Sequence, residues 1–195
     1  HQIPDKVQYL AKLADKRNNL SMLRVSKAKE LLPYAPEVFQ VINESYRHLY
    51  GFVPLTQRQI EVYVKQYFSF IKPEYVPVVL DSNGKVAAFG ITMPSLSRAM
   101  QKNQGHLWPL GFLSILKAMN NNPYADLYLT AVRPDMQNKG VNAMLMYEIN
   151  KVYIKHNIKY VETNRELEHN SKVQAQWRFY DARKHKRRRV YKKVL

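Results

Sequence analysis

The stretch from Leu127 to Ala143 constrains the fold most, because it reads as a strand, a tight turn and a helix in immediate succession. An apolar run over residues 127–132 stops before Pro134, and small and polar residues lead to Gly140, where a helical pattern begins. In such a turn the backbone N–H groups converge at a helix N-terminus, where the helix dipole favours negative charge. The segment therefore predicts a cradle for a diphosphate group. An ordinary strand-to-helix loop is the alternative, because short glycine motifs give many false matches.

The composition indicates a globular protein with an anionic partner. The chain has 195 residues, of which 46% are apolar and 24% are charged, and this is enough apolar material for a core. The formal net charge is +16, which predicts a phosphate-bearing cofactor, a nucleic acid or a lipid surface as partner.

The sequence lacks cysteines, a visible secretory signal, a membrane-spanning stretch and paired metal ligands. It contains no cysteine and shows no secretory signal at its start, which favours a cytoplasmic location. The most apolar stretch, Leu107–Leu116, contains Pro109 and is too short to cross a bilayer, so no membrane span is expected. The six histidines show no paired metal-ligand spacing, and no metal site is predicted.

Periodicity and turn residues predict the order of helices and strands. Asn83-Gly84 lies between two runs rich in Val, Ile and Phe and signals a hairpin. Residues 95–122 look like an insertion that holds two short helices. The expected elements are a helix over Pro4–Asn18, a strand over Leu20–Val25, helices over Tyr34–Leu49 and Thr56–Ile71, strands over Tyr75–Leu80, Lys85–Met93 and Leu127–Val132, a helix after Gly140, a strand over Ile158–Thr163, a helix over Asn170–Asp181 and a final strand or strand pair over Lys186–Leu195.

The turn Gln137-Asn138-Lys139-Gly140-Val141-Asn142 resembles the acetyl-coenzyme A signature of the GNAT acyltransferase superfamily, Gln/Arg-x-x-Gly-x-Gly/Ala. The order of elements resembles the GNAT fold over residues 20–195. The resemblance implies a mixed α/β (α+β) domain with a mostly antiparallel sheet that splays between its fourth and fifth strands. The insertion resembles that of a bacterial GNAT subgroup in which the domain forms the C-terminal part of a longer protein. Residues 1–19 are then a helical segment or linker, and residues 20–195 a single domain.

The resemblance also implies a binding site for acetyl-coenzyme A or a longer acyl-coenzyme A. The fourth strand would bind the pantetheine arm, the turn amides would hold the diphosphate, and a later Asn would contact the cofactor. Taken alone, Lys139 is an ordinary solvated lysine and Asn170 an ordinary helix N-cap. Asn142 departs from the Gly or Ala of the signature. The implied cofactor-binding residues are Ala131, Val132, Gln137, Asn138, Lys139, Gly140, Val141, Asn142, Ala143 and Asn170.

The implied catalytic residues depart from the family pattern. Many acetyltransferases carry a Tyr that protonates the leaving thiolate, but Trp177 stands at that position and has no acidic proton of use near neutral pH. Tyr180 is the nearest substitute. Glu162 is the expected general base on the fifth strand, with Glu166 and Glu168 as further candidates. A strand-edge carboxylate paired with a Lys or Arg is the structural alternative for Glu162.

Two segments admit both a structural and a functional interpretation. The apolar insertion around Leu107–Leu116 fits a channel for an acyl chain or a lid packed on the core. The basic tail contains Arg187-Arg188-Arg189, which fits weak polyanion binding or a solvated strand edge.

Three functions follow from these observations. The first is an acyl-coenzyme A-dependent N-acyltransferase acting on a small-molecule or peptide amine. The second is a non-catalytic coenzyme A-binding or regulatory module, favoured by Asn142 and Trp177. The third, a nucleic-acid-binding domain led by the tail, lacks a recognised binding motif. The sequence names neither the acceptor amine, the acyl length nor the oligomeric state.

Overall fold

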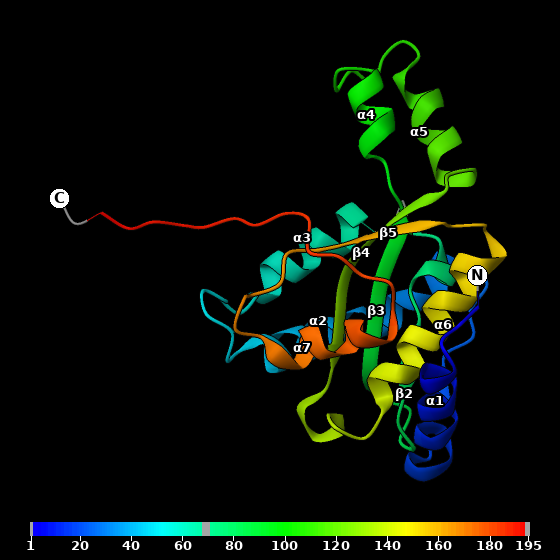
Figure 1. The fold of residues 1–195 in the computed structure, drawn as a ribbon, viewed down its shortest axis with the longest axis vertical. Coiled ribbons are helices and arrows are strands. Elements are labelled where there is room, and N and C mark those ends of the chain that lie inside the picture. Colours follow the sequence, from blue (N-terminus) through cyan, green and yellow to red (C-terminus); the bar gives the residue numbers. More distant parts are fainter. Residues whose placement is uncertain (1, 68–70, 194–195) are drawn as a thin grey trace. The chain divides into compact units, whose positions relative to one another are not determined.

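The secondary structure follows the predicted order over most of the chain. The computed structural model describes residues 2–67 and 71–193 (Figure 1). In chain order the elements are α1 (Asp5–Asn18), β1 (Ser21–Met22), the 3₁₀ helix η1 (Ala28–Tyr34), α2 (Ala35–Tyr46), α3 (Gln57–Tyr67), η2 (Pro73–Tyr75), β2 (Val78–Leu80), β3 (Val86–Pro94), α4 (Ser97–Lys102), α5 (Gly111–Asn120), β4 (Tyr124–Val132), η3 (Pro134–Met136), α6 (Val141–Lys155), β5 (Tyr160–Thr163), α7 (Ser171–Gln176) and η4 (Trp177–Phe179).

The chain divides into two compact units, His1–Asn164 and Arg165–Leu195. The first unit holds all five strands, in the order β1-β2-β3-β4-β5. Its strand pairs are antiparallel except for β4 and β5, which are parallel. The prediction of a mixed, mostly antiparallel sheet is confirmed.

The sheet splays where the sequence predicted it. Strand β5 pairs only with residues Tyr124 to Leu127 of β4, whereas β4 continues to Val132. On its other side β4 pairs with β3 from Ala125 to Val132, apart from a bulge at Tyr128. Half of β4 therefore presents an edge that β5 does not cover, and this edge leads into the turn before α6.

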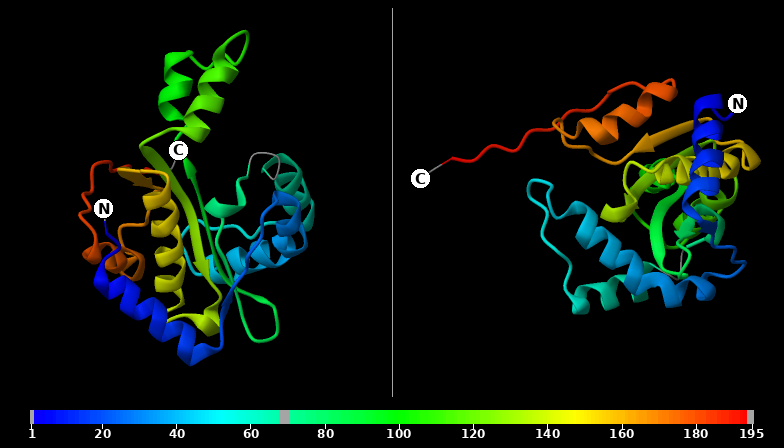
Figure 2. Two further views of the ribbon diagram at one scale, coloured as in Figure 1. Left: turned by 90° about the vertical axis from the view of Figure 1, so that its right-hand side faces the viewer. Right: turned by 90° about the horizontal axis from the view of Figure 1, so that it is seen from below.

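Helices cover both faces of the sheet in the first unit. Figure 2 shows α1 and α6 on one side and α2 and α3 on the other. Ala11 and Ala14 of α1 are buried in one cluster with Val141 and Leu145 of α6, so the N-terminal helix is part of the core. A second cluster joins α2 to the opposite face of β2, β3 and β4.

Several predicted boundaries are wrong for identifiable reasons. Strand β2 starts at Val78 rather than Tyr75, because Pro77 lacks the N–H that a ladder needs and residues 73–75 form η2. Strand β1 spans two residues and matches the short β2. The continuation of α3 over residues 68–70 lies outside the described residues.

The predicted final strand is also wrong over the described residues 186–193, which have no regular secondary structure. A strand needs a partner for its backbone groups, and the described part of the second unit holds no strand. Residues 194–195 lie outside the described residues. No helix among the described residues is long and apolar enough to cross a bilayer.

The insertion forms the two predicted helices, α4 and α5, but neither predicted role for its apolar residues holds. Leu107, Trp108 and Leu110 are exposed rather than packed on the core or around a channel. The helices pair with each other instead, and they project from the end of β3 and the start of β4 (Figure 1).

Candidate functional site

The uncovered edge of β4 has a defined pattern of backbone groups. Arg133 donates its N–H to the carbonyl of Ala87 at 2.9 Å, which fixes the alternation of the β3–β4 ladder. By this alternation the N–H and C=O groups of Thr130 and Val132 point away from β3, and those of Ala131 point toward Phe89. The uncovered edge therefore offers the backbone of Thr130 and Val132 to a ligand.

Side chains of α2 already bind the two carbonyls on this edge. The Tyr46 hydroxyl donates to the Thr130 carbonyl at 2.9 Å, and the Ser45 hydroxyl donates to that of Val132 at 2.8 Å. Burial raises the pKa of Tyr46 despite its bond to Thr130, so this hydroxyl stays a donor at neutral pH. What remains for a ligand is a pair of N–H groups along the edge.

The turn after β4 forms the N-terminus of α6. Asn138 and Gly140 adopt positive φ angles of 61° and 81°, which reverse the chain so that α6 starts at Val141. The Gln137 side chain donates back to the Val132 carbonyl at 3.1 Å. Lys139 is exposed beside the first turn of α6. The first amides of a fifteen-residue helix and one cation thus share this turn.

Arg133 holds the turn against the β2–β3 hairpin. Its guanidinium donates to Asp81 at 2.8 Å, to Asp135 at 2.7 and 3.0 Å and to the Val86 carbonyl at 3.1 Å. Asp135, followed by Asp81, raises the pKa of Arg133. Burial alone would raise the pKa of Asp81, but hydrogen bonds from Arg133 and two backbone amides hold it below its usual value. This network fixes the start of the turn.

Helix α1 supports the other end of the turn. A Cβ atom on Gly140 would lie 3.1 Å from Cβ of Ala14 and 3.4 Å from the carbonyl oxygen of Leu10. The Asn18 side chain donates to the Lys139 carbonyl at 3.2 Å. Glycine is therefore favoured at position 140 both by its φ angle and by the close approach of α1.

No protein-family model matches the chain. Protein YghO of Escherichia coli strain K12 is 22% identical over an alignment of 192 residues, which covers 95% of this chain and 49% of that protein. The chain thus spans about half the length of this relative.

Solved acetyltransferases share its architecture. The aminoglycoside N-acetyltransferase AAC(6')-Iy in complex with CoA gives a TM-score of 0.54 at 9% identity, over 90% of this chain and 95% of that one. A possible acetyltransferase from Clostridium difficile 630 gives 0.52 at 15% identity, over 90% and 98% of the two chains. An aminoglycoside acetyltransferase from an uncultured soil metagenomic sample, in complex with sisomicin, gives 0.53 at 13% identity, over 90% and 96%. The chain has the GNAT acetyltransferase fold.

Two carboxylates lie side by side where the GNAT sheet splays. Glu162 of β5 is the register partner of Asp126 of β4, and cross-strand partners project from the same face. The Tyr128 hydroxyl donates to Asp126 at 3.3 Å. Burial, followed by the nearby Asp126 carboxylate, raises the pKa of Tyr128 to about 12. Two carboxylates and a protonated phenol therefore lie near the end of the β4–β5 ladder.

The second unit contains the remaining predicted residues. Asn170 caps α7, accepting a bond from the Val173 N–H at 3.4 Å. Trp177 donates its indole N–H to Glu166 at 2.7 Å, and burial raises the pKa of Glu166 despite this bond. The predicted helix over Asn170–Asp181 tightens into η4 at Trp177, and Tyr180 follows in extended conformation. The cofactor contact of Asn170 and the catalytic role of Tyr180 stay predictions.

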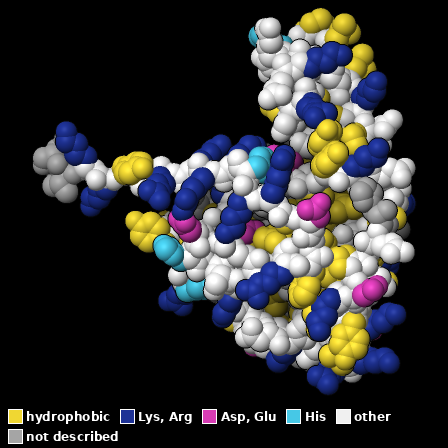
Figure 3. All heavy atoms as spheres, viewed as in Figure 1, with side chains coloured by type: hydrophobic (Ala, Val, Ile, Leu, Met, Phe, Trp, Pro, Cys, Tyr) yellow, Lys and Arg dark blue, Asp and Glu magenta, His cyan; other side chains and the backbone are white. Residues whose placement is uncertain are grey.

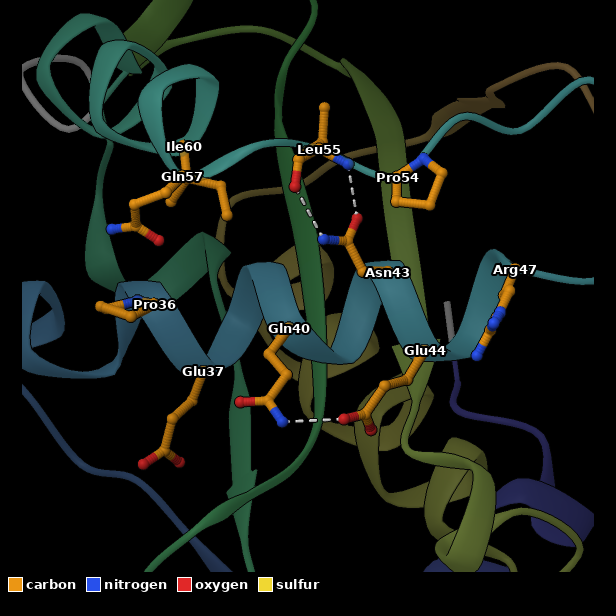
Figure 4. A pocket seen from close by; sticks show the side chains of 10 residues that line it. All are labelled: Pro36, Glu37, Gln40, Asn43, Glu44, Arg47, Pro54, Leu55, Gln57 and Ile60. Atoms are coloured by element: carbon orange, nitrogen blue, oxygen red, sulfur yellow. Dashed lines mark hydrogen bonds between the residues drawn. The ribbon is translucent and has the colours of Figure 1, made fainter.

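A pocket elsewhere in the first unit contains none of the predicted site residues. It has a volume of about 590 Å³ and lies between α2 and the segment that leads into α3. Its polar groups are largely paired with one another: Asn43 bonds both backbone groups of Leu55, and Gln40 donates to Glu44 (Figure 4).

The roles of Arg133, Ser45, Tyr46 and Asp126 were not predicted from the sequence. The Arg-Pro-Asp order at the end of the fourth strand is a signal for an anchored turn. Ser45 and Tyr46 gave no signal, because their role depends on how α2 packs across the sheet. Asp126 would have followed from the register of the fourth and fifth strands, which the sequence does not define.

Proposed function

We propose that the chain is an acyl-coenzyme A-dependent N-acyltransferase. The observation that carries the proposal is the uncovered edge of β4 running directly into the turn at Gly140. The amide carbonyl oxygens of the pantetheine arm would accept hydrogen bonds from the N–H groups of Thr130 and Val132. The diphosphate would lie against the first amides of α6 and Lys139. An aminoglycoside acetyltransferase of the same fold was solved with CoA, which supports the choice of cofactor.

The reaction would be direct attack of an amine nitrogen on the thioester carbonyl carbon. The C–N bond forms, the C–S bond breaks, and the coenzyme leaves as a thiolate. Glu162, or its neighbour Asp126, would take the proton that the amine loses. The thiolate would take a proton from water or, as the resemblance suggests, from Tyr180. Backbone amides of the splay would orient the thioester.

The two carboxylates also suggest what kind of acceptor binds. An amine that is a cation in solution would be attracted to Asp126 and Glu162, and one of these carboxylates would take its proton before the nitrogen attacks. Two neighbours of the same fold are aminoglycoside acetyltransferases, so polyamines and aminoglycosides are suitable first acceptors to test, together with lysine peptides.

Release of free coenzyme A from acetyl-CoA tests this function. The chain has no cysteine, so a disulfide reagent detects the product thiol without reacting with the protein. We expect amine-dependent thiol release with at least one acceptor, reduced about 100-fold or more in the double variant D126N/E162Q. CoA binding without turnover on any amine would favour the alternative, a CoA-binding module. Trp177 stands at the position where a Tyr acid is expected, and its indole N–H is bonded to Glu166. This arrangement supports the alternative.

A further inference from the structure

The α4–α5 hairpin, residues 97–120, carries an exposed apolar surface at its tip. Trp108 is 80% exposed, Leu110 66% and Leu107 62%. The Trp108 ring stacks on Phe112 with centroids 6.1 Å apart, so the aromatic pair forms one surface. Isolated exposed apolar residues are common, whereas clustered ones mark an interaction site. The members of this surface are Met100, Leu107, Trp108, Leu110, Phe112, Leu113 and Leu116.

The charges around this surface have one sign. Residues 95–122 contain Arg98, Lys102 and Lys117 and no Asp or Glu. All three cations are exposed, and Figure 3 shows Lys and Arg interspersed with the hydrophobic side chains of the hairpin. A surface that combines apolar side chains with cations alone is complementary to anionic headgroups over an acyl layer.

Several backbone N–H groups that flank the tip are hydrogen-bonded within the hairpin. Gly105 donates to the Met100 carbonyl at 2.9 Å, His106 to Asn103 at 2.8 Å and Phe112 to Leu107 at 2.8 Å. Entry into a layer poor in water costs free energy mainly for unpaired polar groups. These amides would therefore enter without losing a hydrogen bond.

We propose that the α4–α5 hairpin docks on an anionic lipid surface. Leu107, Trp108 and Leu110 enter the interface, and Lys102 and Lys117 contact the headgroups. The hairpin projects beyond the sheet of its own unit (Figure 1), so its tip reaches a flat surface without the sheet touching it. Trp at the tip fits this placement, because its ring prefers the boundary between headgroups and acyl chains.

Tryptophan emission reports the docking directly. The chain has two Trp residues, and W177F leaves Trp108 as the single reporter. Vesicles of equal parts phosphatidylcholine and phosphatidylglycerol should shift its emission to the blue, whereas phosphatidylcholine alone should shift it far less. An unchanged emission with the anionic vesicles would overturn the proposal.

Sedimentation with the same vesicles separates the hairpin from the basic tail. The variant W108S/L110S should bind at least about tenfold more weakly than the unmodified chain. The control Y50S/V53S removes two side chains that are 93% and 77% exposed elsewhere and should bind within about twofold. If R187Q/R188Q/R189Q abolishes binding and W108S/L110S does not, the tail is the docking element and the proposal fails. The proposal also fails if the chain does not bind the vesicles and instead forms a dimer that is lost in the variant W108S/L110S.

Discussion

At the scale of single residues, Gly140 shows how one position can serve the fold and the site together. Its φ of 81° turns the chain into α6, and a Cβ atom there would be in tight contact with Ala14 of α1 at 3.1 Å. The sequence motif predicts Gly140 as part of a binding site for a diphosphate. The structure adds the packing of α1 against it, which no local pattern indicates because the bonded residues Asn18 and Lys139 are 121 positions apart in the sequence.

Gly140→Ala should therefore be more destabilising than a change of conformation alone explains. Gly84 is a matched control, since it has a φ of 72° and open space where a Cβ would lie. Gly84→Ala should lower the free energy of unfolding by about 1 kcal/mol. Gly140→Ala should cost about 1 to 2 kcal/mol more, because Ala14 must move. Equal losses in urea unfolding would show that α1 does not press on the turn.

At the scale of elements, the Arg133 network joins the end of β4 to the β2–β3 hairpin. The Asp81 side chain is only 8% exposed, so loss of Arg133 would leave a nearly buried carboxylate short of its partner. Arg133→Met should lower the free energy of unfolding by about 2 to 3 kcal/mol. Arg24→Met, which removes a guanidinium 68% exposed and paired with Glu148, should cost about 1 kcal/mol or less.

The same network predicts a pH dependence. Arg133 holds the pKa of Asp135 below its usual value, and that of Asp81 despite burial. A lowered folded-state pKa contributes stability above the ordinary pKa, near 4, that is lost as the pH falls. Unfolding between about pH 6 and 3 should show a smaller acid loss in Arg133→Met than in the unmodified chain. Parallel curves for the two proteins would contradict this account of Asp81 and Asp135.

Elements with local signals were predictable from the sequence, and elements that need a partner were not. Short sequence segments predict three features: the hairpin at Asn83-Gly84, the apolar stripe of α6 and the turn at Gly140. All three are present. Residues 186–193 have the composition of a strand, but over the described residues they pair with no other strand. In the same way, the carboxylate pair of Asp126 and Glu162 depends on register, which only the packed sheet determines.

At the scale of the whole molecule, the net charge of +16 is the main long-range property. The tail concentrates part of it, and Arg187 pairs with Glu168 within its own unit. R187Q/R188Q/R189Q should weaken nonspecific binding of a DNA duplex, with a shallower dependence on salt. The control K12Q/K16Q/R17Q removes the same charge from exposed positions of α1 and should have a smaller effect. Equal effects of both variants would mean that net charge, not the tail, governs the binding.

The central claim, that the turn before α6 binds the diphosphate of coenzyme A, is tested most directly by calorimetry. Gly140 is unsuitable for this test because its substitution disturbs α1, whereas Lys139 is exposed and its side chain can be changed alone. We expect one CoA site per chain, with Lys139→Glu weakening the affinity by about tenfold or more. Lys27→Glu, the same charge change at another exposed lysine, should alter it by less than about twofold. Absence of CoA binding, or equal affinities for Lys139→Glu and the unmodified chain, would contradict the claim.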